Sequence, residues 1–80
     1  MILKIISADQ MVFEGEITSV TLPGVLGSFT VLKNHASLIS VLTVGVISYK
    51  AAGESDNEHN YDITGGIADV DNNVVSVCLY

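Results

Sequence analysis

Short runs of β-branched residues, interrupted at regular intervals by turn residues, dominate the chain. Val, Ile and Thr together account for 24 of the 80 residues. Branched side chains restrict χ1, so they fit the half-buried surface of a sheet better than a helix. Strands that recur about every 8–12 residues are typical of β-sandwiches and barrels. The pattern therefore predicts an all-β fold.

Nine runs are expected to form strands, and residues that favour turns lie between them. Pro23-Gly24 favours a reversal of the chain, Gly15 a bulge or tight bend, and Asp71-Asn72-Asn73 a hairpin turn. The polar segment Ala51–Asn60 is expected to be an exposed loop. The runs are Ile2–Ser7, Met11–Glu14, Glu16–Leu22, Ser28–Leu32, Leu38–Val41, Gly45–Lys50, Asn60–Thr64, Ile67–Val70 and Val74–Leu79.

Alternation within the runs predicts which side chains face the core. Val20 and Leu22 alternate with polar residues, and Val75, Val77 and Leu79 alternate with Ser76 and Cys78, as in strands with one wet face. The run Ile2–Ser7 is apolar on both faces, which predicts cover on both sides, from the fold or from a partner. Ala36–Leu42 also satisfies a helical period and is too short to decide by periodicity.

Length and composition predict one small domain over residues 1–80 that depends on a partner. A chain of this size buries only about 60% of its unfolded surface on folding. Hydrophobic residues make up 49% of the sequence, enough to exclude disorder, while charged residues make up only 15%. Because polar surface is scarce, we expect some apolar surface to face another protein.

Charge is distributed unevenly along the chain. Three lysines balance three carboxylates in residues 1–50, whereas residues 51–80 hold six carboxylates and neither lysine nor arginine. All of the net charge of −6 therefore lies in the last thirty residues. Binding to a phosphate backbone requires a cationic surface, so nucleic acid and anionic lipid headgroups are excluded as direct ligands.

The first residues and the one cysteine indicate a cytosolic setting. The stretch Met1–Ile6 contains a lysine and is far shorter than a signal peptide's apolar segment or a membrane span. Cys78 cannot form an internal disulfide, in agreement with a reducing compartment. Its apolar neighbours predict a buried strand cysteine in preference to a nucleophile.

Candidate catalytic and metal-binding residues are few. Glu54, Asp56, Glu58 and His59 include potential cation ligands, but their spacing does not match a calcium loop, so a solvated loop is the better interpretation. His35 lies in no nucleophile motif and is interpreted as a structural or interface histidine. The glycines do not form a phosphate-binding loop. We therefore expect no metal, no cofactor and no enzymatic activity.

Several motifs, taken in order, resemble the epsilon subunit of F-type ATP synthase, and the resemblance covers almost the whole chain. Their order and spacing are specific, although no single motif is diagnostic. They are Ile6-Ser-Ala-Asp-Gln-Met-Val-Phe-Glu-Gly15, Val20-Thr-Leu-Pro-Gly24, Gly27-Ser-Phe-Thr-Val-Leu32 leading to His35-Ala36, Gly45-Val-Ile, Thr64-Gly-Gly-Ile-Ala-Asp-Val70 and Asn73-Val-Val-Ser-Val77.

The resemblance implies a flattened β-sandwich of about ten strands and a mechanical role without catalysis. Epsilon belongs to the central stalk of the proton- or sodium-translocating enzyme. There it binds the gamma subunit and rests on the ring of membrane c subunits. The chain would then be peripheral, on the cytoplasmic face of a bacterial energy-transducing membrane.

The resemblance also assigns two sets of interface residues. The loop that approaches the c ring corresponds here to Gly24, Gly27, Ser28, Phe29 and Lys33. Relatives often carry an acidic residue at the position of Ser28 and Pro-Gly in place of Lys33-Asn34, so the resemblance implies the docking site here but not the charge pairing with the ring.

The gamma interface in the family corresponds to a second set of positions in this chain. These are Ser7, His35, Ala36 and Leu38. An ordinary turn or core role is the alternative for each.

Most relatives continue after the last strand into a helical hairpin that inhibits ATP hydrolysis or binds ATP. This sequence ends at Tyr80, so we expect neither function in it, and the Met1 start without a tag favours a naturally short chain. The alternative function is a free-standing β-sandwich adaptor that binds peptides by strand addition.

Overall fold

The fold is built entirely from strands in the part of the chain that the structure describes. This computed structural model describes residues 1–53 and 57–80, and no helix in those residues is long and apolar enough to cross a bilayer. The strands are β1 (Ile2–Ser7), β2 (Gln10–Gly24), β3 (Gly27–Leu32), β4 (Leu38–Leu42), β5 (Gly45–Ala51), β6 (Glu58–Ile63), β7 (Gly66–Asp71) and β8 (Val74–Leu79).

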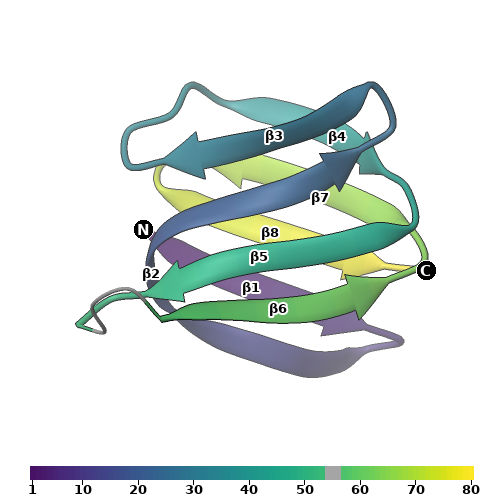
Figure 1. Ribbon diagram of the computed structural model, residues 1–80, viewed down its shortest axis with the longest axis horizontal. Helices are drawn as coiled ribbons and strands as arrows, with labels where there is room; N and C mark the ends of the chain where they lie inside the picture. The colour runs from purple at the N-terminus through teal and green to yellow at the C-terminus, as the bar shows by residue number, and fades with distance from the viewer. Residues whose placement is uncertain (54–56) are drawn as a thin grey trace.

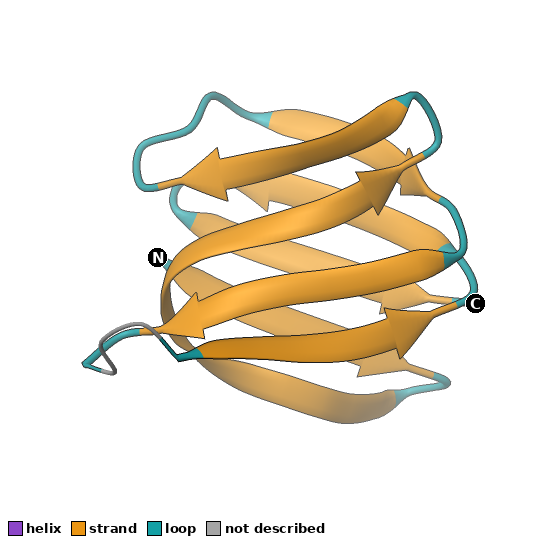
Figure 2. Cartoon of the chain, viewed as in Figure 1, coloured by secondary structure: helices purple, strands orange, loops and turns teal. Residues whose placement is uncertain are grey.

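The strands form two layers that face each other across the core (Figures 1 and 2). The front layer contains β3, the second half of β2, β5 and β6, and the back layer contains β4, β7, β8, β1 and the first half of β2 (Figure 1). Neighbouring strands are antiparallel, except that β1 and β8 are parallel. The predicted β-sandwich is confirmed, and its Cα extents of 30 × 24 × 22 Å make it only slightly flattened.

Strand β2 passes from one layer to the other. Its first half pairs with β1 as far as Glu16, and its second half pairs with β3 and β5. The predicted separation of two strands at Gly15 is wrong, because β2 runs through this residue, which pairs with Leu3, although β2 does bend into the other layer just beyond it (Figure 1). Irregular register occurs instead opposite Ile5/Ile6 and between Ile17 and Ser19. The two runs on either side of Gly15 thus merge, and the described residues form eight strands instead of about ten.

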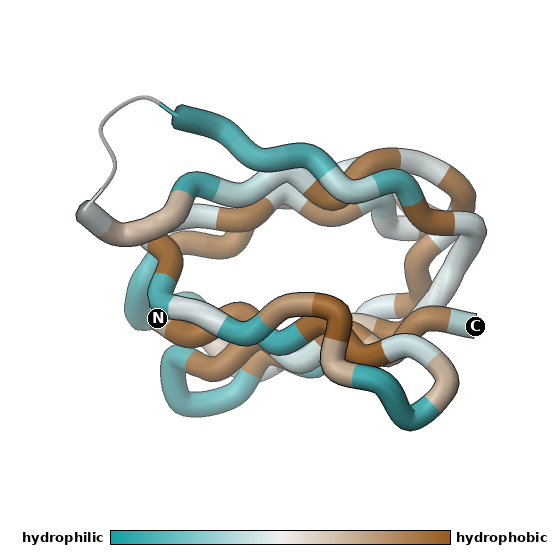
Figure 3. The backbone as a smooth tube through the Cα atoms, turned by 90° about the horizontal axis from the view of Figure 1, so that it is seen from below, coloured by the Kyte–Doolittle hydropathy of each residue, from teal (hydrophilic) through white to brown (hydrophobic). Residues whose placement is uncertain are grey.

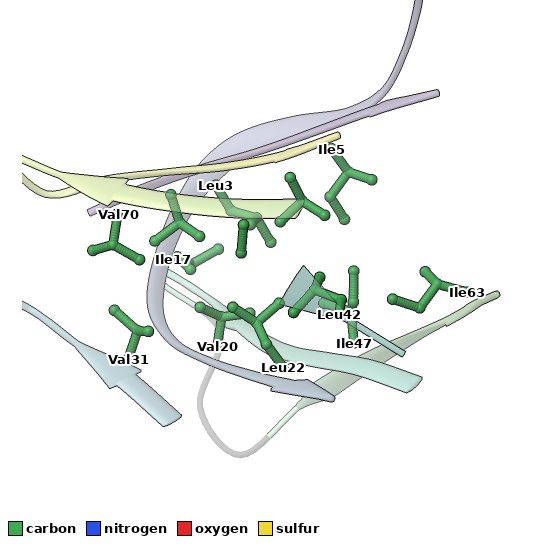
Figure 4. Packing of buried hydrophobic residues seen from close by; sticks show 13 residues of the cluster. Leu3, Ile5, Ile17, Val20, Leu22, Val31, Leu42, Ile47, Ile63 and Val70 are labelled. Carbon is green, nitrogen blue, oxygen red and sulfur yellow. The ribbon is translucent and has the colours of Figure 1, made fainter. Parts of the chain in front are cut away.

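The core consists of aliphatic side chains that both layers point inward (Figure 4). The predicted inward residues Val20, Leu22, Val75 and Val77 are each fully buried, which confirms the alternation. Within the described ranges no polar side chain is buried. The core residues are Leu3, Ile5, Ile17, Val20, Leu22, Val31, Leu42, Ile47, Ile63, Ala68, Val70, Val75 and Val77.

Two of the hairpins close with two-residue turns in which both central residues have positive φ. Asn72 and Asn73 have φ of 48° and 61° between the paired residues Asp71 and Val74, so the predicted hairpin is confirmed. Positive φ at both central residues is the requirement of a type I′ turn, which asparagine tolerates. The β1–β2 turn at residues 8–9 has the same form, with φ of 48° and 64°. The sequence did not reveal this turn, because alanine is not a residue that favours it.

Three further segments settle or correct the predictions. The ambiguous segment Ala36–Leu42 contains strand β4 and no helix. The expected loop over Ala51–Asn60 is shorter than predicted, since β5 extends to Ala51 and β6 begins at Glu58. Glu54 and Asp56, two of the candidate cation ligands, lie outside the described residues.

The prediction that Cys78 is buried is wrong, because the cysteine is exposed. It alternates with the buried Val77, so its side chain points out of the back layer. Apolar neighbours in sequence indicated burial on both faces, whereas only one face of β8 is covered within the domain.

A close approach of two strands predicts the effect of a glycine substitution. A Cβ added at Gly66 would lie 2.5 Å from the carbonyl oxygen of Cys78 and 3.2 Å from the Cα of Leu79. At Gly15 the nearest atom would be the Phe13 ring tip at 2.9 Å, which can move. We expect Gly66→Ala to lower the free energy of unfolding by about 1–3 kcal/mol, and Gly15→Ala by less. Urea denaturation of both variants checks this, and equal losses would contradict the backbone clash.

Candidate interaction surfaces

The candidate interaction sites of the described residues are exposed apolar and charged surfaces. The described residues contain no group of three His, Cys, Asp or Glu side chains placed to hold a metal ion. Two open depressions lie on the outside of the back layer, and both are lined by Asp69 and Asp71 of β7. Neither is lined by histidine or cysteine; a serine lines each, Ser76 in one and Ser37 in the other, and Ser37 Oγ donates to Asp71 Oδ1 at 2.8 Å.

A continuous row of apolar side chains crosses the outer face of the back layer. Strand register places one residue from each of β4, β7, β8, β1 and β2 side by side, far apart though they are in sequence. Three members are substantially exposed, at 46% for Val41, 42% for Ile67 and 51% for Met11. We call this set the apolar row: Val41, Ile67, Cys78, Ile6 and Met11.

Two further rows of outward-facing residues follow the apolar row along the strands, both on the same side of it, and they carry the charges of this face. The first contains Asp69 next to Ile39 and Ser76, and then Lys4 next to Glu14. The second contains Asp71, Val74, Ile2 and Glu16. The outer face of the back layer is therefore apolar toward one end of the sandwich and largely acidic toward the other.

The outer face of the front layer has a different character. Its side chains hydrogen-bond to one another across the strands, with 2.8 Å between the hydroxyls of Thr21 and Thr30 and 2.9 Å from Ser48 Oγ to Asn60 Oδ1. Strand β6 is hydrophilic along most of its length (Figure 3). The front layer also exposes Val46 and Leu32, but the described residues of its outer face form no apolar row that crosses every strand, as those of the back layer do.

The β2–β3 turn forms a second exposed apolar site at the end of the sandwich near the C-terminus (Figure 1). Val25 is 55% exposed and Leu26 fully exposed, and Val44 of the adjoining β4–β5 connection is 68% exposed. The Val25 amide donates to the Val41 carbonyl at 3.0 Å, which joins this turn to the apolar row. The sequence analysis missed Val25 and Leu26, although an apolar pair between two turn glycines is a visible signal.

The residues expected at the c ring are divided between two ends of β3. Gly24 and Gly27 enclose the exposed turn, and Ser28 beside them is exposed. Phe29 is half-buried and packs against the core. Lys33 follows the far end of β3, about 20 Å from Gly27 at roughly 3.3 Å per residue.

The residues expected at the gamma interface lie at opposite corners of the back layer. His35 and Ala36 are exposed in the β3–β4 loop just before β4, and Leu38 packs against the core. Ser7 ends β1 beside Leu79, at the other end of the strands. The structure therefore brings the first three together and separates them from Ser7 by about 17 Å or more, the length of β8 at roughly 3.3 Å per residue.

The loop that carries His35 is held in place by hydrogen bonds. The His35 amide donates to the Leu32 carbonyl at 3.1 Å, and Asn34 between them has φ of 66°, as at the third position of a type II turn. The Asn34 amide donates to Asn73 Oδ1 at 2.6 Å, and Asn73 Nδ2 donates to Asn34 Oδ1 at 3.1 Å. The loop is thereby fixed to the β7–β8 hairpin turn.

Comparison with known proteins identifies the family. The family model described as "ATP synthase, Delta/Epsilon chain, beta-sandwich domain" matches residues 1–79. The chain belongs to this family. The resemblance found in the sequence is thus confirmed, and the names of the relatives agree with the expectation of a non-catalytic ATP synthase subunit.

Curated relatives carry the name ATP synthase epsilon chain. The relative from Campylobacter curvus is 40% identical over 78 residues, covering 94% of this chain and 57% of its own length. The relative from Nitratidesulfovibrio vulgaris (strain DP4) is 36% identical over 75 residues, covering 94% of this chain and 54% of its own length. The chain therefore spans about half the length of the curated relatives that it matches.

Solved structures show the same fold within larger assemblies. A chain in the Euglena gracilis mitochondrial ATP synthase OSCP/F1/c-ring structure superposes with a TM-score of 0.89 at 25% identity, covering 99% of this chain and 49% of that chain. A chain in the Tetrahymena thermophila central stalk/c-ring structure has a TM-score of 0.79 at 18% identity, covering 99% and 62%. The second similarity concerns the fold alone.

The two hydrogen bonds between Asn34 and Asn73, here called the clamp, hold the His35 loop of this delta/epsilon-type domain. They lead to predictions for two matched variants. Asn73→Gly keeps the left-handed turn but removes both hydrogen bonds to Asn34, so we expect unfolding stability to fall by about 1 kcal/mol. Asn72→Gly keeps the clamp and relieves the turn, so stability should stay unchanged or rise. Urea denaturation gives the stabilities, and hydrogen exchange at the His35 amide should quicken only in Asn73→Gly. Equal behaviour of the two variants would show that the clamp is unimportant.

Proposed function

We propose that this domain is a non-catalytic rotor element of an F-type ATP synthase, linking the gamma subunit to the c ring and transmitting rotation. The observation that carries the proposal is the family match over residues 1–79, in a domain that leaves apolar surface exposed at two sites. The complex would place it at the cytoplasmic face of a bacterial energy-transducing membrane. Its close-packed core suits mechanical coupling, because protein interiors transmit strain with little compression.

The outer face of the back layer is the proposed gamma interface. The residues assigned to gamma bracket this face, with Ser7 at the end of β1 and His35, Ala36 and Leu38 at the start of β4. The apolar row crosses the area between them. The apolar outer side of β1 is only partly covered within the domain, so it too is available to the partner.

The β2–β3 turn is the proposed c-ring contact. Gly24, Gly27 and Ser28 surround it, and Val25 and Leu26 provide its exposed apolar tip. Phe29 supports the turn from the core side, since its ring would lie 3.0 Å from a Cβ added at Gly24. Lys33 lies away from this turn, so it would meet the ring only if the contact extends along β3.

The gamma contact is tested by a substitution in the apolar row. Ile67→Asp places a charge where an apolar side chain would be desolvated, so the affinity for purified gamma should fall at least about tenfold. Thr30→Asp, on the outer face of the front layer, is the control and should leave the affinity nearly unchanged. Co-elution and surface plasmon resonance with gamma provide the measurement. Failure of the wild-type chain to bind gamma, combined with binding to extended peptides, would favour the strand-adding adaptor instead.

The c-ring contact is tested at the tip of the turn. Leu26 is fully exposed, so Leu26→Ser should not change the unfolding free energy of the domain. Burying a leucine contributes about 1.5–3 kcal/mol, so retention of the gamma–domain complex by detergent-solubilised c rings should fall about tenfold or more. Binding to gamma alone serves as the control and should be unaffected. Unchanged retention by the c ring would show that this turn is not the contact.

A further inference from the structure

The carboxylates on the outer face of the back layer differ in their neighbours. Glu14 lies across from Lys4, and Glu16 Oε1 lies 3.9 Å from the N-terminal ammonium. On β7, in contrast, the cross-strand neighbours of Asp69 are Ile39 and Ser76. The cross-strand neighbour of Asp71 is Val74, and its Oδ1 accepts a hydrogen bond from Ser37 Oγ at 2.8 Å. The charges on β7 therefore have no cation beside them in the strand ladder.

The surface beside these two carboxylates is recessed. One depression, on the β8 side of β7, is lined by Asp69, Asp71 and Ser76, and another, on the β4 side, by Asp69, Asp71 and Ile39. A lysine or arginine side chain fits such a place, because its aliphatic stem packs on apolar surface while its cationic head reaches a carboxylate. The apolar row begins immediately beside Asp69, with Ile67 two residues away on the same face of β7.

We propose that the partner covering this face presents lysine or arginine side chains to Asp69 and Asp71 and apolar side chains to the apolar row. This inference rests on the proposed gamma contact and specifies the chemistry of the gamma surface. A face with charge at one end and apolar area at the other can be matched in one orientation only, because reversal would bury the carboxylates against apolar groups. The paired charges would act mainly on the association rate and on orientation, and the apolar row on the lifetime of the complex.

The experiment compares two charge reversals that change net charge equally. Asp69→Lys changes the proposed face. Asp62→Lys is the control, because Asp62 lies opposite Val46 on the front layer. Association and dissociation rates with purified gamma are measured by stopped flow between about 20 and 500 mM salt. We expect Asp69→Lys to slow association about tenfold or more at low salt, with the difference shrinking as salt rises. Asp62→Lys should slow it no more than about threefold.

The outcomes separate this inference from the proposed function. Equal slowing by the two variants would mean that only net charge acts, and faster association of Asp69→Lys would mean an acidic partner; either result overturns the inference while gamma binding stands. Absence of wild-type binding at every salt concentration would overturn the proposed function and the inference with it. Asp69→Asn is measured in parallel, so that a folding defect of the lysine variant does not decide the result. It should show a smaller slowing in the same direction.

Discussion

The two layers depend on one strand that belongs to both. Strand β2 pairs with β1 in the back layer and with β3 and β5 in the front layer, and it touches β4 through the pair Gly24–Leu42. Ile17, just beyond the crossing point, is buried in the core. Because β2 is hydrogen-bonded to strands of both layers, a displacement of one layer is resisted by backbone pairing as well as by side-chain packing. The apolar row and the β2–β3 turn are therefore held in fixed positions relative to each other.

Much of the fold follows from local pattern. The alternation of Val20 and Leu22 with polar residues fixes which face of the strand is buried, and Asn72-Asn73 supply the positive φ that a tight hairpin needs. Local pattern does not predict strand continuity or burial where these depend on residues distant in sequence. Gly15 looks like a break but sits in a strand whose Phe13 ring covers it, and Cys78 has apolar neighbours but faces outward. Neither outcome can be read from the residues adjacent in sequence.

The candidate surfaces are harder to predict than the core, because they are assembled by long-range register. The resemblance to the epsilon family pointed to Ser7 and His35, but only the structure shows that they bracket one face. Ile6 and Cys78 are neighbours because β1 and β8 pair in parallel. Parallel strands are not joined by a tight turn, so no local turn sequence predicts this pairing. The surroundings of the Asp69 carboxylate are likewise formed by long-range pairing, because its neighbours Ile39 and Ser76 come from β4 and β8.

The parallel pairing of β1 and β8 has a consequence for the order of events during synthesis. Strand β8 lies between β1 and β7, so the apolar row stays interrupted until residues 74–79 have emerged from the ribosome and inserted between strands made earlier. Chains emerge at about 5–20 residues per second, and domains generally fold as units. A nascent or shortened chain would thus lack a continuous face for its partner. Recognition through this face would select domains whose translation and folding are both finished.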